Sequence, residues 1–352
     1  MSSLKVLFIG GTGTISHGAS TLAVERGLEL TILNRGESSH RPAPAGAELL
    51  QADVRDPASM RAALGDREFD VVADFVAFTP DHVRADLELF EGRTGQYLFI
   101  SSASAYQKPV ARLPITESTP LRNPFWQYSR DKVACENLLI EAYRERDFPV
   151  TIIRPSHTYD QTSLPLNGGW TTVDRMRRGE PIVVHGDGTS LWVLTHTRDF
   201  AKAFVGLLGH PQAIGDTFQI TSDEVLNWNQ IAGLMGDAAG AVPKIVHVTS
   251  DAIAAADPEM GAGHLGDRSH SVIFDNSKVK SLVPDFVATT TFAQGAREIV
   301  DWYDTHPAEK VVDPKLNELF DRLVASAGQA LHDCPEDTGQ RRRQRDNSRS
   351  QR

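Results

Sequence analysis

The stretch that most constrains the fold lies near the start of the chain, where residues 6–16 read VLFIGGTGTIS. An apolar run of strand length leads into a glycine-rich turn, helix-compatible sequence follows, and a second apolar run occupies 28–33. Strand, glycine turn, helix and strand form the unit in which a helix N-terminus receives a pyrophosphate. Gly10 would permit the tight turn, Gly13 would let the backbone approach the phosphates, and Ser16 replaces a third glycine with another small residue. An ordinary strand–helix loop is the alternative, but the flanking elements favour a dinucleotide site.

The composition is typical of a soluble globular protein. The chain has 352 residues, 40% of them hydrophobic and 23% charged, which suffices for one large or two ordinary domains. No apolar run reaches the length of a membrane span, and a strand begins too early to leave room for a signal peptide. Only two cysteines, Cys135 and Cys334, are present, so we exclude a disulfide framework and expect a reducing, cytoplasmic location. The formal net charge of −10 disfavours broad nucleic-acid binding.

Alternating strand and helix patterns continue through the first half of the chain. Apolar runs of strand length recur at 48–52, 70–76, 96–100 and 150–153, with helical patterns between most of them. This alternation predicts an α/β fold with a Rossmann-type, doubly wound parallel sheet. We expect a dinucleotide-binding domain over 1–165 that is rejoined by about 196–222, a smaller α/β substrate domain over 166–195 and 223–335, and a disordered basic tail over 336–352.

The end of the second apolar run is where a dinucleotide fold contacts the adenosine ribose. An acidic residue there favours NAD, whereas a nearby arginine favours the 2′-phosphate of NADP. This chain has Asn34 and Arg35 at that place, with Arg41 a little further on, which favours NADP. A solvated turn is the alternative, since Asn and Gly are common in turns. Asp53, after the third strand, is expected to bond the adenine amine, to cap the helix that begins near Pro57, or to do both.

A tyrosine and a lysine four residues apart, Tyr128 and Lys132, open a predicted long helix and lie on one face of it. A tyrosine with an ordinary pKa of about 10 is a poor base, but a nearby ammonium and a positive nicotinamide ring both favour its phenolate. Tyr128 would then take a proton from a carbinol while hydride leaves for the cofactor. Lys132 would hold the nicotinamide ribose, and Ser102, at the end of the preceding strand, would hold the substrate oxygen. An exposed Tyr–Lys pair is the alternative, but the order of these motifs favours chemistry.

With these motifs together, the chain resembles an atypical member of the NAD-dependent epimerase/dehydratase family of extended short-chain dehydrogenase/reductases. The segments that match the family pattern are 10–13 (GGTG), 101–106 (SSASAY), 128–132 (YSRDK), 154–155 (RP), 186–188 (GDG) and 275–278 (DNSK). The resemblance implies a sugar or nucleotide-sugar-like substrate and catalysis by Ser102, Tyr128 and Lys132. It places the contacts to NAD or NADP at Gly10, Thr12, Gly13, Thr14, Ile15, Asn34, Arg35, Asp53, Val54, Ala77, Tyr128, Lys132 and Pro155.

Three departures from the family pattern bear on the substrate. Family dehydratases carry an Asp-Glu pair where this chain has Ala103 and Ser104, which argues against a 4,6-dehydratase. Many nucleotide-sugar enzymes carry a diphosphate-clamping arginine near the position of Trp192, so a nucleotide sugar needs another cation, for which the arginines within 175–178 are candidates. His157 stands where relatives often have an asparagine. We expect Ser104, His157 and Trp192 to contact the substrate, with packed structural roles as the alternative for His157 and Trp192.

Two functions from different classes remain open. The first is an enzyme that transfers hydride at a secondary alcohol: an epimerase if the cofactor is recycled in place, or a reductase if it exchanges. The second is an RNA-binding or redox-sensing protein without turnover, because the chain is also similar to the chloroplast stem-loop RNA-binding proteins. Trp192 and six arginines within 341–352 favour the second function, whereas Tyr128, Lys132 and the acidic net charge favour the first.

The resemblance further implies a homodimer formed through two helices, predicted at 81–91 and 129–146. The expected partner is a small-molecule substrate, and neither a membrane nor a nucleic acid is expected as a partner of the enzyme. The twelve histidines show no spacing typical of metal ligands, so we expect no metal site. Asp160, Gln161 and His196 are further candidates for the substrate cleft.

Overall fold

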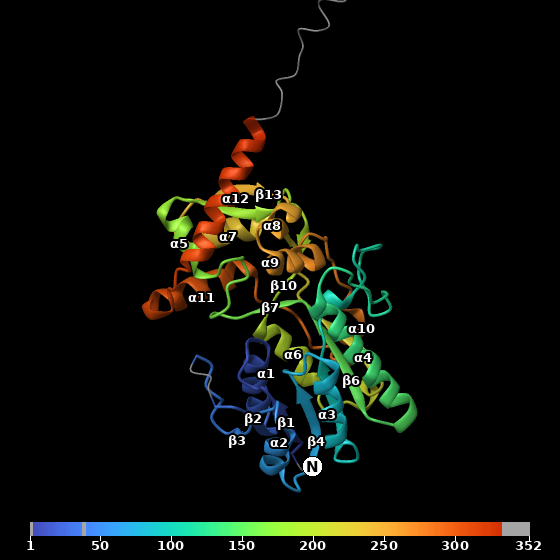
Figure 1. Ribbon diagram of the computed structural model, residues 1–352. Helices are drawn as coiled ribbons and strands as arrows, with labels where there is room; N and C mark the ends of the chain where they lie inside the picture. Colours follow the sequence, from blue (N-terminus) through green and yellow to red (C-terminus); the bar gives the residue numbers. More distant parts are fainter. Residues whose placement is uncertain (1–2, 37–39, 333–352) are drawn as a thin grey trace, which may run out of the picture.

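The computed structural model describes residues 3–36 and 40–332, and its central element is a seven-stranded parallel sheet (Figure 1). In spatial order the strands are β11 (Asp216–Ile220), β6 (Val150–Pro155), β5 (Thr94–Ile100), β4 (Phe69–Asp74), β1 (Lys5–Ile9), β2 (Glu29–Asn34) and β3 (Glu48–Gln51). All neighbouring strands are parallel. The predicted Rossmann-type, doubly wound sheet is therefore confirmed. The strand order reverses between β1 and β4, which opens a crevice at the carboxyl ends of these strands.

Helices cover both faces of the sheet because its central strands are apolar on both sides. In β1, Val6 and Phe8 face one hydrophobic cluster, whereas Leu7 and Ile9 face another, and none of the four is exposed. The first cluster includes α1 (Thr14–Glu25) and α6 (Thr197–Leu207), and the second includes α2 (Pro57–Leu64), α3 (Pro80–Phe90) and α4 (Gln127–Arg146). Both layers position loops at the carboxyl edge of the sheet.

A second group of elements lies at this carboxyl edge, in the upper half of Figure 1. Three two-stranded sheets pair β7 (His157–Tyr159) with β10 (Leu194–His196), β9 (Leu191–Trp192) with β12 (Leu226–Asn227), and β8 (Pro181–His185) with β13 (Lys244–Val248). The other elements of this group are η1 (Ala103–Ala105), α5 (Trp170–Arg178), α7 (Trp228–Ala239), α8 (Ser250–Ala256), α9 (Pro258–Gly263), η3 (His264–Arg268), α11 (Phe292–Thr305), η4 (Pro307–Glu309) and α12 (Pro314–His332). A hydrophobic cluster of their own, with Trp170, Trp192 and Trp228, holds many of them together. Two short elements pack beside the large sheet instead: α10 (Ser277–Leu282) contacts α6 and β11, and η2 (Pro211–Ala213) contacts β11.

Two details of the elements differ from the prediction or extend it. Asp56, not Asp53, caps α2, because the Asp56 carboxylate accepts the Ala58 N–H at 2.9 Å. Helix α12 was not predicted from the sequence. Its residue Phe320 is buried in a hydrophobic cluster. Along the described parts of the chain, no helix has both the length and the apolar character needed to cross a membrane. The predicted tail and Cys334 lie outside the described residues.

Candidate active site

The glycine-rich turn between β1 and α1 adopts a conformation that a larger residue would not allow. Gly10 has a φ of +83°, and a Cβ atom added to it would lie 2.5 Å from Cγ1 of Val76. Ser16, at the position of the third glycine, is buried and donates a hydrogen bond from Oγ to Gly10 O at 2.6 Å. The same Oγ accepts the Gly13 N–H at 2.8 Å. The serine therefore braces the turn at the point where α1 begins.

A groove of about 340 Å³ runs beside this turn. It is lined by Gly10, Thr12, Gly13, Asn34, Arg35, Gly36, Asp53, Val54, Arg55, Val76 and Phe78. The structure thus brings together the turn, the end of β2 and the segment after β3, which are the places where cofactor contacts are expected. Arg55 was not predicted; it donates to Val76 O at 2.6 Å, and its guanidinium lies 5.8 Å from the ring centre of Phe78.

The remaining predicted cofactor residues lie at the ends of neighbouring elements. Thr14 and Ile15 form the first turn of α1, where helix N–H groups have no partner within the helix. Pro155 is buried at the carboxyl end of β6 and pairs with Ile220 in β11. Ala77 follows β4 and is buried. All of these positions lie on the carboxyl side of the sheet.

Asn34 and Arg41, both considered for the ribose end, have different surroundings. Asn34 donates from Nδ2 to Thr12 Oγ1 at 3.3 Å and accepts the Gly36 N–H at 2.9 Å, so it ties the end of β2 to the glycine turn. Arg41 instead forms an ion pair with Asp160, with 2.5 Å between Nε and Oδ2. Arg35 is exposed at the rim of the groove.

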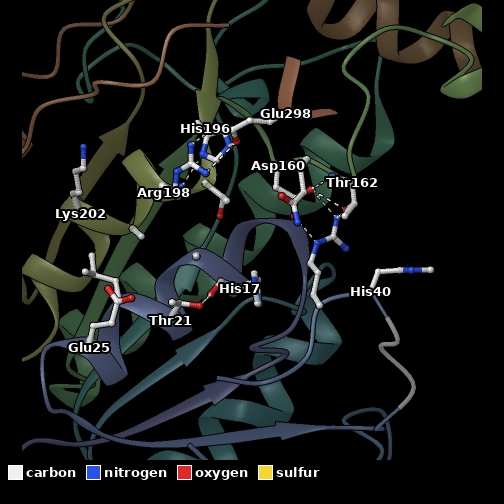
Figure 2. Close-up of a pocket in the computed structure, with 16 residues that line it drawn as sticks. His17, Thr21, Glu25, His40, Asp160, Thr162, His196, Arg198, Lys202 and Glu298 are labelled. Atoms are coloured by element: carbon white, nitrogen blue, oxygen red, sulfur yellow. Dashed lines mark hydrogen bonds and ion pairs between the residues drawn. The ribbon is translucent and has the colours of Figure 1, made fainter. Parts of the chain in front are cut away.

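A second cavity, of about 360 Å³, lies beside α1 and α6 (Figure 2). Figure 2 shows Asp160 and Thr162 on one side of it and His196 with Glu298 on another, above His17 of α1. Asp160, Gln161 and His196 were considered for the substrate cleft, and the structure places them in this second cavity.

Ser102, Tyr128 and Lys132 are brought together at the carboxyl edge of the sheet. Ser102 follows β5, and the other two lie in the first turns of α4. The Ser102 side chain lies close enough to Tyr128 to influence its pKa, and Nζ of Lys132 lies 5.8 Å from the centre of the Tyr128 ring. Nζ of Lys132 donates to the carbonyl oxygens of Ala77 and Ile100, both at 2.7 Å.

Burial dominates the electrostatics of this group. It raises the pKa of Tyr128 to about 12, and the nearby Ser102 side chain offsets only part of that rise. Burial also lowers the pKa of Lys132 to about 8, against the attraction of Asp74. We expected Lys132 to lower the pKa of Tyr128, and for the protein without a cofactor this expectation is wrong. The pKa of Tyr128 is raised, and the Lys132 ammonium donates to two backbone carbonyls.

Ser104 lies behind Ser102 as part of a buried network. Its Oγ lies 2.9 Å from Oγ of Ser102 and accepts the Ser129 hydroxyl at 2.8 Å. Asn123 donates from Nδ2 to Ser104 O at 2.9 Å and to Gly266 O at 2.7 Å, which links the segment before Tyr128 to η3. In this position Ser104 orients the Ser102 hydroxyl.

The two residues that depart from the family pattern, His157 and Trp192, contact each other. The Trp192 indole donates to Nδ1 of His157 at 3.3 Å, and Trp192 also packs on Trp228 with ring centres 5.2 Å apart. Burial, followed by the charge of Arg268, lowers the pKa of His157 to about 3. His157 is therefore a neutral imidazole at physiological pH.

The three arginines of α5 do not replace the missing diphosphate clamp. Each is paired with a carboxylate: Arg175 with Asp321 at 2.7 Å, Arg177 with Asp304 at 2.8 Å, and Arg178 with Asp174 at 2.7 Å. The expectation that one of these arginines replaces the clamp is therefore wrong, because each is already paired with an acid from α5, α11 or α12. Within residues 3–36 and 40–332, no group of three or more His, Cys, Asp or Glu side chains is placed to hold a metal ion.

A parallel Rossmann sheet, a glycine-rich turn at its switch point and a Ser–Tyr–Lys group at its carboxyl edge define a dinucleotide-binding protein of the short-chain dehydrogenase type. The chain belongs to the NAD dependent epimerase/dehydratase family, whose family model matches residues 6–221. Two of the relatives reported below are an epimerase and a reductase, which together with the family supports an NAD-dependent enzyme.

Three relatives are 24–30% identical to this chain over the aligned residues. The chain is 28% identical over 259 residues to the chloroplast stem-loop binding protein of 41 kDa b from Arabidopsis thaliana, which covers 70% of this chain and 66% of that protein. It is 30% identical over 168 residues to a UDP-glucose 4-epimerase from Lactobacillus helveticus, with 43% and 51% covered. It is 24% identical over 292 residues to the 2′-dehydrokanamycin reductase of Streptomyces kanamyceticus, with 81% and 80% covered. The chain thus spans less than two thirds of the length of the first two relatives.

Solved structures share the fold. An epimerase from Methanothermobacter thermautotrophicus superposes with a TM-score of 0.73 at 16% identity, covering 88% of this chain and 94% of the other. The UDP-glucose 4-epimerase of Bifidobacterium longum, solved with NAD+ and UDP, superposes with a TM-score of 0.69 at 20% identity, covering 86% and 99%. These likenesses confirm the α/β fold.

Proposed function

We propose that the protein is an NAD(P)-dependent epimerase or reductase that transfers hydride at a secondary alcohol of a sugar or nucleotide-sugar-like substrate. The observation that carries the proposal is the grouping of Tyr128 with Ser102 and the buried Lys132, at the edge of the sheet that the glycine turn also faces. We further propose that the chain comprises the two domains expected from the sequence and acts in the cytoplasm.

The groove fits a nicotinamide dinucleotide. The N-terminus of α1 would hold the pyrophosphate, and Gly10 leaves room for it where a side chain would strain the turn. Asn34, Arg35 and Asp53 would hold the adenosine end, and Lys132 would hold the nicotinamide ribose. When bound, the nicotinamide accepts a hydride from the substrate carbon or returns one to it.

The side chains would divide the proton chemistry among them. Ser102 would hold the substrate oxygen, and the phenolate of Tyr128 would take the hydroxyl proton. The positive nicotinamide ring would favour that phenolate, since burial alone keeps Tyr128 protonated. Lys132, with a pKa of about 8, is mostly charged at neutral pH and would exchange its carbonyl partners for ribose oxygens.

The reaction type is tested on the purified protein by denaturing it and identifying any released nucleotide by mass spectrometry. Tightly held NAD would support recycling of the cofactor in place and hence an epimerase. An empty site that binds NADPH reversibly would support a reductase and the proposed role of Arg35 at the 2′-phosphate. No affinity for either nucleotide would contradict the enzyme proposal.

A second candidate function, RNA binding without turnover, is favoured by the similarity to the stem-loop binding protein and by the arginines within 341–352. It is tested by retention on an RNA column over a salt gradient, with and without residues 341–352. Salt-sensitive retention of the truncated protein would support it. Retention that disappears with the tail would show only a non-specific charge effect and would contradict RNA binding by the folded protein.

We also propose a homodimer through α3 and α4, which contact each other on one face of the sheet. Light scattering coupled to size-exclusion chromatography tests it. A mass of one chain, 38.6 kDa, at micromolar concentration would contradict this proposal.

A further inference from the structure

The π-helical turn η3 (His264–Arg268) packs against the segment that leads to Tyr128. A Cβ atom added to Gly266 would lie 2.7 Å from Cβ of Trp126, and Asn123 holds the Gly266 carbonyl at 2.7 Å. The charge of Asp267 is close enough to Tyr128 to contribute to its raised pKa. Arg268, the next residue, therefore lies near the proposed active site, and turns of this kind are frequent at functional sites.

Arg268 carries a positive charge that has no carboxylate partner. Among the described residues, none forms a salt bridge with it, and the neighbouring Asp267 is paired instead with the fully buried Lys108 at 3.2 Å. One guanidinium nitrogen of Arg268 donates to Oδ1 of Asn167, and the guanidinium lies 5.7 Å from the ring centre of Trp228. Burial lowers the pKa of Arg268 and the charge of Asp267 opposes that effect, yet a guanidinium stays charged at physiological pH. A partly buried charge without a direct carboxylate contact favours a counter-ion.

The hydrogen bonds around Asn167 leave a buried donor without an acceptor. Because a guanidinium only donates, Asn167 must direct Oδ1 to Arg268 and its amide Nδ2 to Nε2 of His264, which lies 2.5 Å away. Nε2 of His264 then accepts, so the ring proton is on Nδ1. That Nδ1 is buried and has no hydrogen-bond partner among the described residues. The buried Nδ1–H of His264 thus lacks an acceptor among the described residues, and Asn167 is the one acceptor there to which the Arg268 guanidinium donates.

The surrounding imidazoles contribute no further charge. Burial lowers the pKa of His157 to about 3, of His185 to about 4 and of His264 to about 2, and the charge of Arg268 lowers each of them further. All three are neutral at physiological pH. The nearest arginines considered earlier, on α5, are already paired with acids. In these surroundings the one guanidinium without a direct carboxylate contact among the described residues is therefore that of Arg268.

We propose that Arg268, aligned by Asn167, binds a single anionic group of the substrate, a carboxylate or one phosphate. The proposal rests on the proposed function and narrows its substrate to a sugar acid or a sugar phosphate. A guanidinium matches the two oxygens of either group in a bidentate arrangement. One such cation leaves the second charge of a nucleoside diphosphate uncompensated, so a nucleotide sugar is disfavoured.

Calorimetric titration of the protein saturated with NAD+ or NADP+, whichever binds, tests the proposal with four probes: D-glucuronate, D-glucose 6-phosphate, D-glucose and UDP. We expect one of the two singly substituted anions to bind more tightly than glucose or UDP. Arg268→Gln should weaken that binding by about 10- to 100-fold, and Arg268→Lys should restore part of it. Arg178→Gln, a matched loss of an exposed arginine on α5, should leave it unchanged. The carboxylate and phosphate arms identify which group is recognised.

Anion binding by Arg268→Gln equal to that of the wild type overturns the proposal, as does tightest binding of UDP. If Arg268→Gln fails to fold, the wild-type comparison still decides, because anions that bind no better than glucose overturn it. Tyr128→Phe separates this inference from the proposed function. That variant should keep anion binding while losing turnover. Failure of the wild type to bind either cofactor would contradict the proposed enzyme function, and anion binding would then be measured on the protein without cofactor.

Discussion

Trp192 donates its indole N–H to Nδ1 of His157 at 3.3 Å, and these are two residues at which the chain departs from the pattern of its family. The departures are therefore one change rather than two. His157 opens β7 and Trp192 closes β9, so tertiary packing makes them partners across 35 positions of sequence. Where many relatives carry a diphosphate-clamping arginine and often an asparagine, this chain has an indole in contact with a neutral imidazole.

If the pair acts as a unit, its two members should be energetically coupled. We expect Trp192→Phe and His157→Phe together to cost less than the sum of the single changes, with a coupling of about 0.5–1.5 kcal/mol. Urea unfolding of the wild type and the three variants measures it. Additive effects within about 0.3 kcal/mol would show that the hydrogen bond contributes nothing to stability.

Tyr128→Phe should lower kcat by about 100- to 10,000-fold while leaving the Kd for the nucleotide near its wild-type value. The variant removes the proposed acid/base and keeps the ring that packs on Trp126, at 4.9 Å between centres. Tyr143→Phe is the control, since that tyrosine lies on the same helix and is 39% exposed. Wild-type turnover by Tyr128→Phe would remove the tyrosine from the mechanism.

Gly10→Ala should abolish cofactor binding. It should also destabilise the fold by more than the free energy needed to hold an alanine at the positive φ of this position, because the added Cβ also meets Val76. Gly27→Ala is matched to it, because the two glycines have φ values of +83° and +77° but only Gly10 has an atom near the added Cβ. We expect about 1–2 kcal/mol for Gly27→Ala and more for Gly10→Ala. If both variants lose the same stability in thermal unfolding, the contact between the added methyl group and Val76 does not contribute to the loss.

Buried neutral histidines should make stability fall as the pH drops below about 6.5. The folded-state pKa values of His185 and His264, about 4 and 2, lie below the ordinary 6.5, so the unfolded chain binds more protons in that interval and stability is lost with acid. Each contributes up to about 1.4 kcal/mol per pH unit. Urea midpoints at pH 7 and 5 should differ less for His185→Gln than for the wild type. An unchanged difference would exclude His185 as a source.

Arg35→Ala should raise KM for NADP(H) at least about tenfold and leave KM for NAD(H) unchanged, because only the 2′-phosphate needs the guanidinium. Steady-state kinetics with both nucleotides measures the split. Arg41→Ala serves as the comparison, since that side chain is paired with Asp160. Parallel changes with NAD(H) and NADP(H) would contradict a role for Arg35 at the phosphate.

Local patterns in the sequence determined the sheet, the turn at Gly10 and the close grouping of Ser102, Tyr128 and Lys132. Each of these depends on neighbours in the chain: the alternation of β1, the conformation that glycine permits, and the spacing of four residues on one helix face. The parallel order of the strands then carries their carboxyl ends to one edge, so the strand-end residues meet there without further information.

Only the tertiary structure decided which charges are compensated. The arginines of α5 are neutralised largely by acids from α11 and α12, whereas Arg268 donates to the amide oxygen of Asn167 and forms no salt bridge with a carboxylate among the described residues. The same holds for Tyr128, whose pKa rises because burial outweighs the opposing effect of the nearby Ser102 side chain. Burial and ion pairing depend on distances between segments far apart in the chain, which residue spacing does not encode.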